Sequence, residues 1–375
     1  MRRPALRVTA VLGALLLVYL LAWPVPVSPV AWEAPPDPGH TGPFAADSLL
    51  SGLERLSIGE ATGPEAVARD RAGRIYVSTL EGAIVRLTAS GGSPEVWTRT
   101  GGRPLGLAFD TAGTLYVADG VRGLLAVDSL GSVRLLADSA EGTAITFADD
   151  VDVAADGRVY FSDASSKFGV FAAGAEDASV LDIIEHGGHG RLLEFDPATA
   201  HTTILRRGLD FANGVAVAHD GRSVLVSETG HYRIVRIWRD GPRRGEQAIV
   251  IEALPGFPDN IKRGTAGRYW VALFAPRNAL LDRLSARPML RKMLLRIPRA
   301  LRPKASEYGH IIAIDDAGRV HDDRHDPTGA YPKMTSVLET EDHLYIGSIE
   351  APVLARVPVR VPVRVPARLP SPAPR

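Results

Sequence analysis

The chain repeats one phrase, first as Gly63-Pro-Glu-Ala-Val-Ala-Arg-Asp-Arg-Ala-Gly-Arg-Ile-Tyr-Val77 and then as Arg103-Pro-Leu-Gly-Leu-Ala-Phe-Asp-Thr-Ala-Gly-Thr-Leu-Tyr-Val117. Further copies span residues 148–161, 212–226 and 258–271, and a degenerate sixth copy spans 334–347. Most copies join a short apolar run to a second run, rich in β-branched and aromatic residues, through an Asp-Gly or Ala-Gly turn. This pattern is typical of two paired antiparallel strands.

The copies recur roughly every 40 to 50 residues, which is the period of a β-propeller blade with four strands. Two longer gaps are explained by insertions at 164–190 and 277–309. We therefore predict an all-β fold, a six-bladed β-propeller over residues 51–358. An irregular β-sandwich is the alternative, and the shared register of the repeats argues against it.

One register within the repeat carries oxygen-bearing side chains in four of the six copies. Counting back eleven residues from the aromatic of each second strand, or twelve in the fourth copy because Ser223 lengthens its turn, gives Glu65, Leu105, Asp149, Asn213, Asp259 and Met334. Because the innermost strand of each blade begins near the central channel, the four polar side chains are expected to converge at one mouth of that channel.

The charge balance is uneven although the formal net charge is zero. Basic residues gather before the first apolar run, between Arg277 and Lys304, and beyond residue 350, so the remaining body is acidic. A nucleic-acid-binding body would carry the opposite sign, and we expect no nucleic-acid partner. Because the chain has no cysteine, disulfides, thiol catalysis and thiolate metal sites are excluded.

The N-terminus predicts a membrane anchor at residues 1–32. Arg2, Arg3 and Arg7 precede a stretch without charge, residues 8–32, which is long enough to cross roughly 30 Å of hydrocarbon. The basic flank favours a single pass with the propeller on the extracytoplasmic side. A cleaved signal peptide is the alternative. Residues 33–50 are expected to form an extended linker, and the Pro/Arg/Val tail at 359–375 is expected to be disordered.

The second insertion is expected to form amphipathic helices between blades 5 and 6. Leu and Met recur there with helical spacing among Arg residues, interrupted by Pro288 and Pro298. One interpretation is a lid packed over a blade. The other is a lid whose basic segment, residues 277–304, also contacts anionic lipid, so that the membrane is a partner through this insertion as well as through the N-terminal helix.

Carboxylate and amide oxygens at the shared register, without histidine or cysteine, favour a hard cation such as Ca²⁺. Glu65, Asn213, Asp259 and Asp149 are the candidate ligands. A cation there could polarise the carbonyl of an ester or lactone, while Asp149 or Asp150 positions the attacking water. Asn260 is a candidate substrate contact. The alternative is a structural ion that ties the blades together.

The histidines give weaker signals. His231 is expected at a strand edge, or over the channel in contact with substrate. His186 and His189 are expected in a glycine-rich surface loop. His321 and His325, with Asp322, Asp323 and Asp326, are expected in a polar turn that could bind an ion adventitiously.

Several linked motifs resemble the strictosidine synthase-like proteins, and among them the adipocyte plasma membrane-associated protein branch. They are Phe211-Ala-Asn-Gly-Val-Ala-Val217, Val226-Ser-Glu-Thr-Gly-His-Tyr-Arg-Ile234, Phe161-Ser-Asp-Ala-Ser-Ser-Lys-Phe168, Gly190-Arg-Leu-Leu-Glu-Phe-Asp-Pro197 and Gly256-Phe-Pro-Asp-Asn-Ile261. The wider relatives are the gluconolactonase/SMP-30 and paraoxonase propellers. The resemblance implies a six-bladed propeller and, in the hydrolytic relatives, a calcium-type metal in the channel that serves lactonase or arylesterase activity.

Carried over by position, Glu65, Asn213 and Asp259 match metal ligands of those lactonases. Asp149 stands where relatives usually have Asn, which adds a negative charge. Ser336 stands where plant strictosidine synthases place a catalytic Glu, so amine–aldehyde condensation is disfavoured. The predicted function is a membrane-anchored, metal-dependent hydrolase of small esters or lactones. A non-catalytic propeller that binds a ligand or partner around a structural calcium is the alternative.

Overall fold

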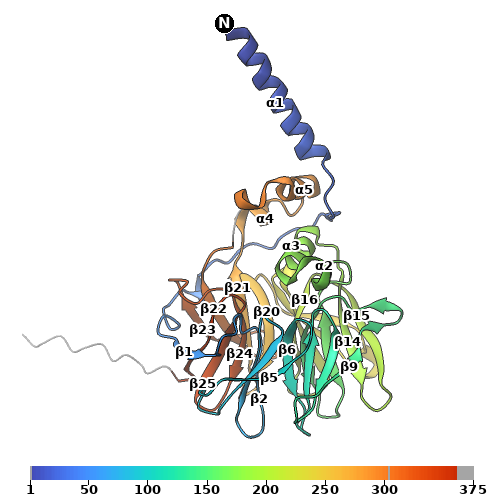
Figure 1. Cartoon of the computed structure of the whole chain (residues 1–375), viewed down its shortest axis with the longest axis vertical. Helices are drawn as coiled ribbons and strands as arrows, with labels where there is room; N and C mark the ends of the chain where they lie inside the picture. Colours follow the sequence, from blue (N-terminus) through green and yellow to red (C-terminus); the bar gives the residue numbers. More distant parts are fainter. Residues whose placement is uncertain (1, 303–304, 361–375) are drawn as a thin grey trace, which may run out of the picture.

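The structure, a computed structural model, describes residues 2–302 and 305–360. Within these residues six four-stranded antiparallel sheets are arranged as the blades of a propeller (Figure 1). The prediction of a six-bladed propeller is confirmed. The predicted disorder of the tail concerns residues that, from 361 onward, lie outside the described part of the chain.

The first three blades follow one another along the chain. Blade 1 contains β2 (Val67–Arg69), β3 (Ile75–Ser78), β4 (Ala83–Leu87) and β5 (Glu95–Arg99). Blade 2 contains β6 (Pro104–Phe109), β7 (Leu115–Asp119), β8 (Gly123–Val127) and β9 (Val133–Ala137). After a small hairpin of β10 (Ser139–Ala140) and β11 (Thr143–Ala144), blade 3 contains β12 (Ala148–Val153), β13 (Val159–Asp163), β14 (Gly190–Asp196) and β15 (His201–Leu209).

The remaining blades close the ring. Blade 4 contains β16 (Ala212–Val217), β17 (Ser223–Glu228), β18 (Arg233–Trp238) and β19 (Gln247–Ile251). Blade 5 contains β20 (Gly256–Arg263), β21 (Tyr269–Pro276), β22 (Gly309–Ile314) and β23 (Val320–Asp326). Blade 6 contains β24 (Met334–Glu339), β25 (His343–Ser348), β26 (Val353–Pro358) and, as its outer strand, β1 (Glu54–Ser57). Since β1 precedes blade 1 in the chain, its pairing with β26 joins the two ends of the propeller.

The turn inside the repeated phrase follows from its residues. In blade 1 the backbone N–H of Gly73 donates to the carbonyl of Asp70 at 3.0 Å, and the N–H of Arg74 donates to the Asp70 carboxylate at 2.9 Å. Gly73 has a positive φ of 82°, which glycine adopts without steric cost. The carbonyls of Asp110 and Asp315 accept the same kind of bond, from the N–H groups of Gly113 and Gly318.

Apolar side chains fill the spaces between neighbouring blades. Between blades 1 and 2, Tyr76 and Ile84 pack against Leu107, Leu115 and Val117 in one buried cluster. Burying a Leu, Ile or Val side chain contributes about 1.5–3 kcal/mol each. Every blade is thus held by its neighbours, which fixes the positions of the inner strands around the channel.

Residues 23–50, the N-terminal segment, lie against the propeller, whereas the helix before them does not (Figure 1). Helix α1 (Arg2–Ala22) projects away from the body (Figure 1). The following residues run across one end of the propeller, where Val27 and Phe44, the last residue of η1 (Gly42–Phe44), are buried. In the part of the chain that the structure describes, no helix is both long and apolar enough to span a bilayer. The predicted transmembrane helix is therefore not confirmed.

Both insertions interrupt a blade. Helices α2 (Val170–Ala173) and α3 (Ala175–Glu185) lie between β13 and β14 of blade 3. Helices α4 (Ala279–Arg283) and α5 (Pro288–Arg296), with η4 (Arg299–Leu301), lie between β21 and β22 of blade 5. The prediction that this second insertion separates blades 5 and 6 is wrong, because β22 and β23 follow it and complete the sheet begun by β20 and β21. Both insertions cover the end of the propeller nearest α1 (Figure 1).

Candidate functional site

The candidate residues lie where the inner strands leave regular pairing. In β12 the register shifts between Ala148 and Val151, a segment that contains Asp149 and Asp150. Equivalent shifts enclose Asn213 in β16 and the pair Asp259-Asn260 in β20. A bulge of this kind re-aims side chains and is common beside functional sites.

The four predicted polar residues are buried together. Glu65, Asp149, Asn213 and Asp259 have exposed fractions of 4, 5, 5 and 6 %. Burial raises the pKa of Asp259 well above its usual value, and the charges of Glu65 and Asp149 raise it further. Burial, followed by the charges of Glu65 and Asp150, likewise raises the pKa of Asp149. A hydrogen bond from Asn213 opposes the shift of Asp259. Residues from blades 1, 3, 4 and 5 therefore share one buried environment.

This buried cluster has more negative than positive charge. Arg103 lies 3.4 Å from Glu65, and Lys262 lies 2.6 Å from Asp150. Among the described residues, neither Asp149 nor Asp259 forms an ion pair with a Lys, Arg or His side chain. An unpaired buried carboxylate is costly, so it either binds a proton or requires a cation.

The donor atoms fit a hard cation. Asn213 Oδ1 is buried without a hydrogen-bond partner, as are both polar side-chain atoms of Asn260. Together with the carboxylates they offer the oxygens that Ca²⁺ prefers. The carboxylates of Glu65, Asp149 and Asp259 are not close enough to form a ready-made metal site. Among the described residues, groups of three or more His, Asp or Glu ligand atoms within 4.8 Å of one another occur only elsewhere. All three carboxylates would therefore have to move closer together to hold a single ion.

Asp150 is engaged in contacts between blades. Its carboxylate accepts hydrogen bonds from Lys262 Nζ at 2.6 Å, from the Val215 N–H at 2.9 Å and from the Val151 N–H at 2.8 Å. Because these partners lie on blades 3, 4 and 5, the geometry supports a structural role for Asp150 more than the catalytic role expected from the sequence.

In blade 6 the structure places Thr335, and not Met334, at the shared register. Val337 pairs with Ile346, whereas the equivalent Val67 of blade 1 pairs with Val77, so the blade 6 turn is shorter. Counting back a fixed number of residues therefore lands one position early. The hydroxyls of Thr335 and Ser336 donate to the Glu65 carbonyl at 2.6 and 2.7 Å, which ties blade 6 to the start of blade 1.

A second polar cluster, His186–Asp210–His231, lies at the same end of the propeller as Asn213 and Asp259. His186 follows the last residue of α3, Asp210 precedes β16, and His231 ends η2 (Thr229–His231). His231 Nδ1 lies 3.0 Å from the Asp210 carboxylate, and the two Nε2 atoms lie 3.4 Å apart. The η2 turn contacts blade 5 directly, since Thr229 donates to the Pro258 carbonyl at 2.6 Å.

Trp32 of the N-terminal segment covers this cluster. Its ring stacks on His186 with centroids 4.0 Å apart and 8° between planes. The expectation of a surface loop is therefore wrong for His186, which is buried, and burial lowers its pKa to about 3. Neither Asp210 nor Trp32 was predicted from the sequence, because nothing in the repeated phrase indicates that distant segments meet here.

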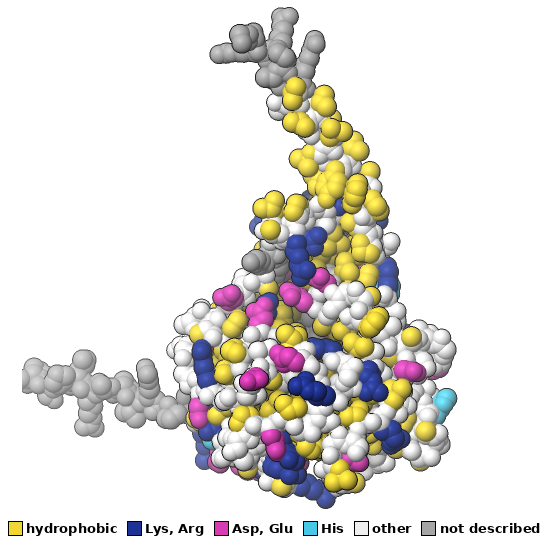
Figure 2. All heavy atoms as spheres, viewed as in Figure 1, with side chains coloured by type: hydrophobic (Ala, Val, Ile, Leu, Met, Phe, Trp, Pro, Cys, Tyr) yellow, Lys and Arg dark blue, Asp and Glu magenta, His cyan; other side chains and the backbone are white. Residues whose placement is uncertain are grey.

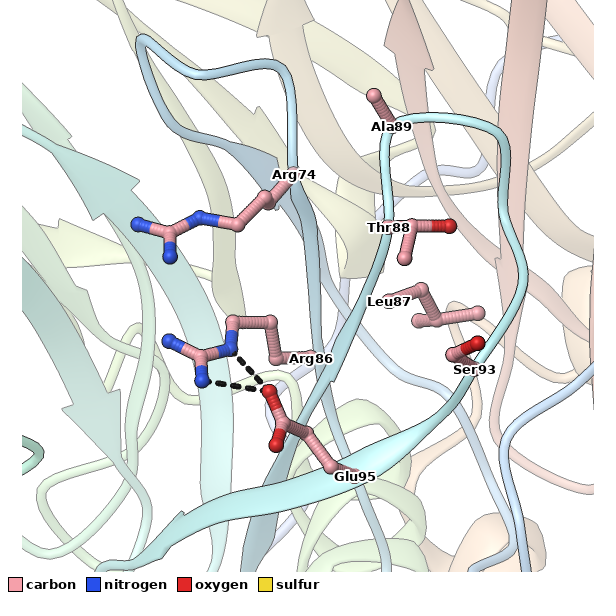
Figure 3. Close-up of a pocket in the computed structure, with 7 residues that line it drawn as sticks. All are labelled: Arg74, Arg86, Leu87, Thr88, Ala89, Ser93 and Glu95. Carbon is pink, nitrogen blue, oxygen red and sulfur yellow. Dashed lines mark hydrogen bonds and ion pairs between the residues drawn. The ribbon is translucent and has the colours of Figure 1, made fainter.

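A surface hollow of about 270 Å³ lies elsewhere, on strands β4 and β5 of blade 1 (Figure 3). Two of its charged members, Arg86 and Glu95, are paired with each other at 2.6 Å. The hollow contains none of the channel residues.

These features define a propeller of the strictosidine synthase kind. The strictosidine synthase family matches residues 149–242, and the N-terminal family of strictosidine synthase-like proteins matches residues 42–87. The chain belongs to the strictosidine synthase-like family that includes adipocyte plasma membrane-associated protein. It is 33% identical to that protein from Salmo salar, over 91% of this chain and 86% of the relative. It is 32% identical to strictosidine synthase-like protein 4 of Arabidopsis thaliana, over 83% of each chain.

Solved structures with the same fold have low sequence identity. A gluconolactonase from Xanthomonas campestris superposes with a TM-score of 0.60 at 18% identity, over 88% of this chain and 98% of that one. A calcium-binding regucalcin from Agrobacterium tumefaciens superposes with a TM-score of 0.57 at 14% identity, over 81% and 93%. These likenesses show that the fold is that of the gluconolactonase kind of propeller.

Proposed function

We propose that this protein is a metal-dependent hydrolase of small esters or lactones that works at the mouth of the propeller channel. The observation that carries the proposal is the buried excess of negative charge formed by Asp149 and Asp259 beside Glu65 and Asn213. The names of the gluconolactonase and regucalcin neighbours support a lactone substrate and a divalent cation.

Glu65, Asn213 and Asp259 are the proposed ligands, and Asp149 is either a fourth ligand or a group that orients water. When bound, a calcium-type cation would polarise the substrate carbonyl and stabilise negative charge on its oxygen. Asn260 has unpartnered buried polar atoms close by and remains the candidate substrate contact.

His231 is the proposed general base. Asp210, 3.0 Å from Nδ1, would hold the ring in the tautomer whose Nε2 accepts a proton, and Nε2, which lies 3.4 Å from His186 Nε2, would have to leave that contact to reach water. The same nitrogen could return the proton to the leaving alcohol, so that the ester bond breaks and the acid and alcohol leave. This assignment gives His231 a more active role than the substrate contact expected from the sequence.

Amine–aldehyde condensation is not supported. The position that would need an acid is held by Ser336, which is buried and whose hydroxyl donates to the Glu65 carbonyl. A synthase of that type would therefore lack its catalytic acid here.

The covered mouth favours a second candidate, a non-catalytic propeller that binds a ligand around a structural ion. Trp32 lies over His186, and the backbone N–H of Trp32 donates to the Ser285 carbonyl at 3.3 Å. The N-terminal segment would therefore have to move to admit a bulky substrate. Turnover of phenyl acetate and of a γ-lactone, with and without Ca²⁺, separates the candidates. Calcium-dependent turnover that His231→Gln abolishes without changing the melting temperature supports the hydrolase. Calcium stabilisation without turnover supports the binding protein.

We also propose that the α1 end of the molecule faces a membrane, with the propeller on the extracytoplasmic side. Hydrophobic side chains cover α1, and others are exposed near its base (Figure 2). In the two insertions, Phe171 of α2 and Leu301 of η4 have exposed fractions of 88 and 73 %. Helix α5 contacts the end of α1, since Tyr19 donates to the Arg296 carbonyl at 2.9 Å. Relatives named plasma membrane-associated proteins support an association with a membrane.

A further inference from the structure

Three histidines meet on the outer strands of blade 5, away from the channel residues. His310 of β22 and His325 of β23 are paired across the sheet, and their rings stack with centroids 4.0 Å apart. His40 of the N-terminal segment brings its ring to 5.3 Å from that of His325 and 5.7 Å from that of His310. One ring nitrogen from each of the three lies within 4.8 Å of the others. The expectation of a polar turn at 321–326 is wrong, because β23 is a regular strand that brings His325 to His310.

One carboxylate orients two of these rings. Asp323 accepts from His310 Nε2 at 2.7 Å and from His325 Nε2 at 2.6 Å. When Nε2 carries the proton, Nδ1 of each ring has the lone pair. Nδ1 of His325 lies 3.0 Å from the Tyr308 hydroxyl, so a metal bound there would displace that contact. A carboxylate behind a histidine is the usual arrangement at metal sites, where it fixes the tautomer and raises the basicity of the ligand.

The third ring is held in place by its own segment. The Asp47 carboxylate accepts from the His325 N–H at 2.9 Å, and the Leu50 N–H donates to the His325 carbonyl at 2.9 Å. These bonds dock the N-terminal segment along β23. The Tyr308 hydroxyl lies 3.0 Å from His325 Nδ1, and the Tyr308 ring stacks under His40 with centroids 4.5 Å apart.

We propose that His40, His310 and His325 bind a divalent transition metal of the zinc type, with the fourth position open to water. Three imidazoles with a carboxylate behind two of them suit zinc, whereas the oxygen donors of the channel suit calcium. The bound metal would fasten the N-terminal segment to blade 5, because His40 belongs to the segment and the other two ligands belong to the blade. This site is independent of the proposed hydrolase activity.

Calorimetric titration with Zn²⁺ tests the proposal. The sample is the untagged full-length chain after treatment with a chelator. We expect a zinc-binding event in the wild type that is lost in His40→Ala and His310→Ala. Asp323→Asn should weaken binding about 10- to 100-fold, the usual cost of losing such a carboxylate. The matched control is His321→Ala, which removes an exposed histidine from the same strand and should bind as the wild type does.

His40→Ala decides the outcome even if the His310 variant fails to fold, since His40 is only partly buried and lies outside the sheets. Its melting temperature in chelator should match that of the wild type, whereas its zinc-induced rise should vanish. Zinc binding by His40→Ala equal to that of the wild type would overturn the proposal and assign the metal to another histidine cluster. A wild type that binds no zinc would overturn it as well.

Discussion

Asp259 is a buried acid without a cation of its own. Glu65 differs, because Arg103 lies beside it and would be left unpaired if that carboxylate were removed. Burial and the charges of Glu65 and Asp149 raise the pKa of Asp259, so its ionised form is unfavourable in the metal-free protein. Neutralising Asp259 therefore isolates the effect of the cation better than neutralising Glu65.

Asp259→Asn should stabilise the metal-free protein and abolish its response to calcium. The first effect follows from removing an acid whose ionisation is opposed by burial and by the charges of Glu65 and Asp149, and the second from removing a ligand. In the wild type, calcium at 100 times its dissociation constant should add about 2.7 kcal/mol to the free energy of unfolding. Melting temperatures in chelator and in calcium measure both effects, with Asp220→Asn, in an exposed turn, as the control. A full calcium response in Asp259→Asn would exclude this residue as a ligand.

His186 should make the protein sensitive to acid. Its pKa is lowered from about 6.5 to about 3 by burial, although Asp210 opposes the shift. Since the unfolded chain takes up the proton more readily, the stability that His186 contributes above pH 6.5 is lost as the pH falls toward 3. His186→Gln should therefore reduce the drop in melting temperature between pH 7 and pH 5. Asp210 does not contribute to the change in stability between pH 7 and pH 5, because its pKa is lowered from a usual value of 3.8. If the melting temperature of His186→Gln falls as much as that of the wild type, His186 is not a source of the sensitivity to acid.

The position of a single residue can be predicted from the sequence only where the repeat carries it. The shared burial of Glu65, Asn213 and Asp259 was predictable because equivalent strands place equivalent residues at equivalent positions. Their role as ligands stays a prediction. Thr335 was missed by one position because a turn length varies between blades. Asp210 and Trp32 were not found at all, since they meet through loops and the N-terminal segment, which have no repeat.

At the scale of elements, the insertion of α4 and α5 shows what a pattern can and cannot predict. Helical spacing of Leu and Met predicted helices interrupted by Pro288 and Pro298, and in the structure Pro288 is the first residue of α5. The pattern did not indicate which strands the insertion joins, because strands β21 and β22 carry no marker of their place within blade 5. The structure adds that Arg291 is buried and donates to the Ile184 carbonyl of α3 at 2.9 Å, so the insertion is docked on the body.

Other basic residues of this insertion remain exposed and should contact anionic lipid. Among them are Arg283 and Arg287. Each basic residue near an anionic surface contributes about 1 kcal/mol. A chain that begins at residue 24, and so lacks α1, should therefore float with phosphatidylserine vesicles and lose this binding when Arg283 and Arg287 are changed to Glu. Arg71→Glu, in the turn between β2 and β3, is the control. Equal flotation of all variants would show that the insertion serves only as a lid.

For the whole molecule, closure of the ring couples the two ends of the chain. Glu65 belongs to blade 1 and Asp259 to blade 5, and blade 6 between them is completed by β1. Pairing of β1 with β26 extends from Glu54↔Arg356 to Ser57↔Val353. Thr335 and Ser336 of blade 6 also hold the Glu65 carbonyl. The geometry of the channel site thus depends on a strand that contributes no residue to it.

Removing β1 should therefore weaken the channel site. A chain that begins at residue 59 lacks the outer strand of blade 6, whereas one that begins at residue 53 retains it and serves as the matched control, since both lack the N-terminal segment. Each backbone hydrogen bond lost should cost about 0.5–1.5 kcal/mol. We expect the shorter chain to melt at a lower temperature and to lose most of its calcium-induced stabilisation, while the control retains it. If both chains respond to calcium equally, the axial residues are positioned by their own blades, and closure of the ring by β1 contributes stability alone.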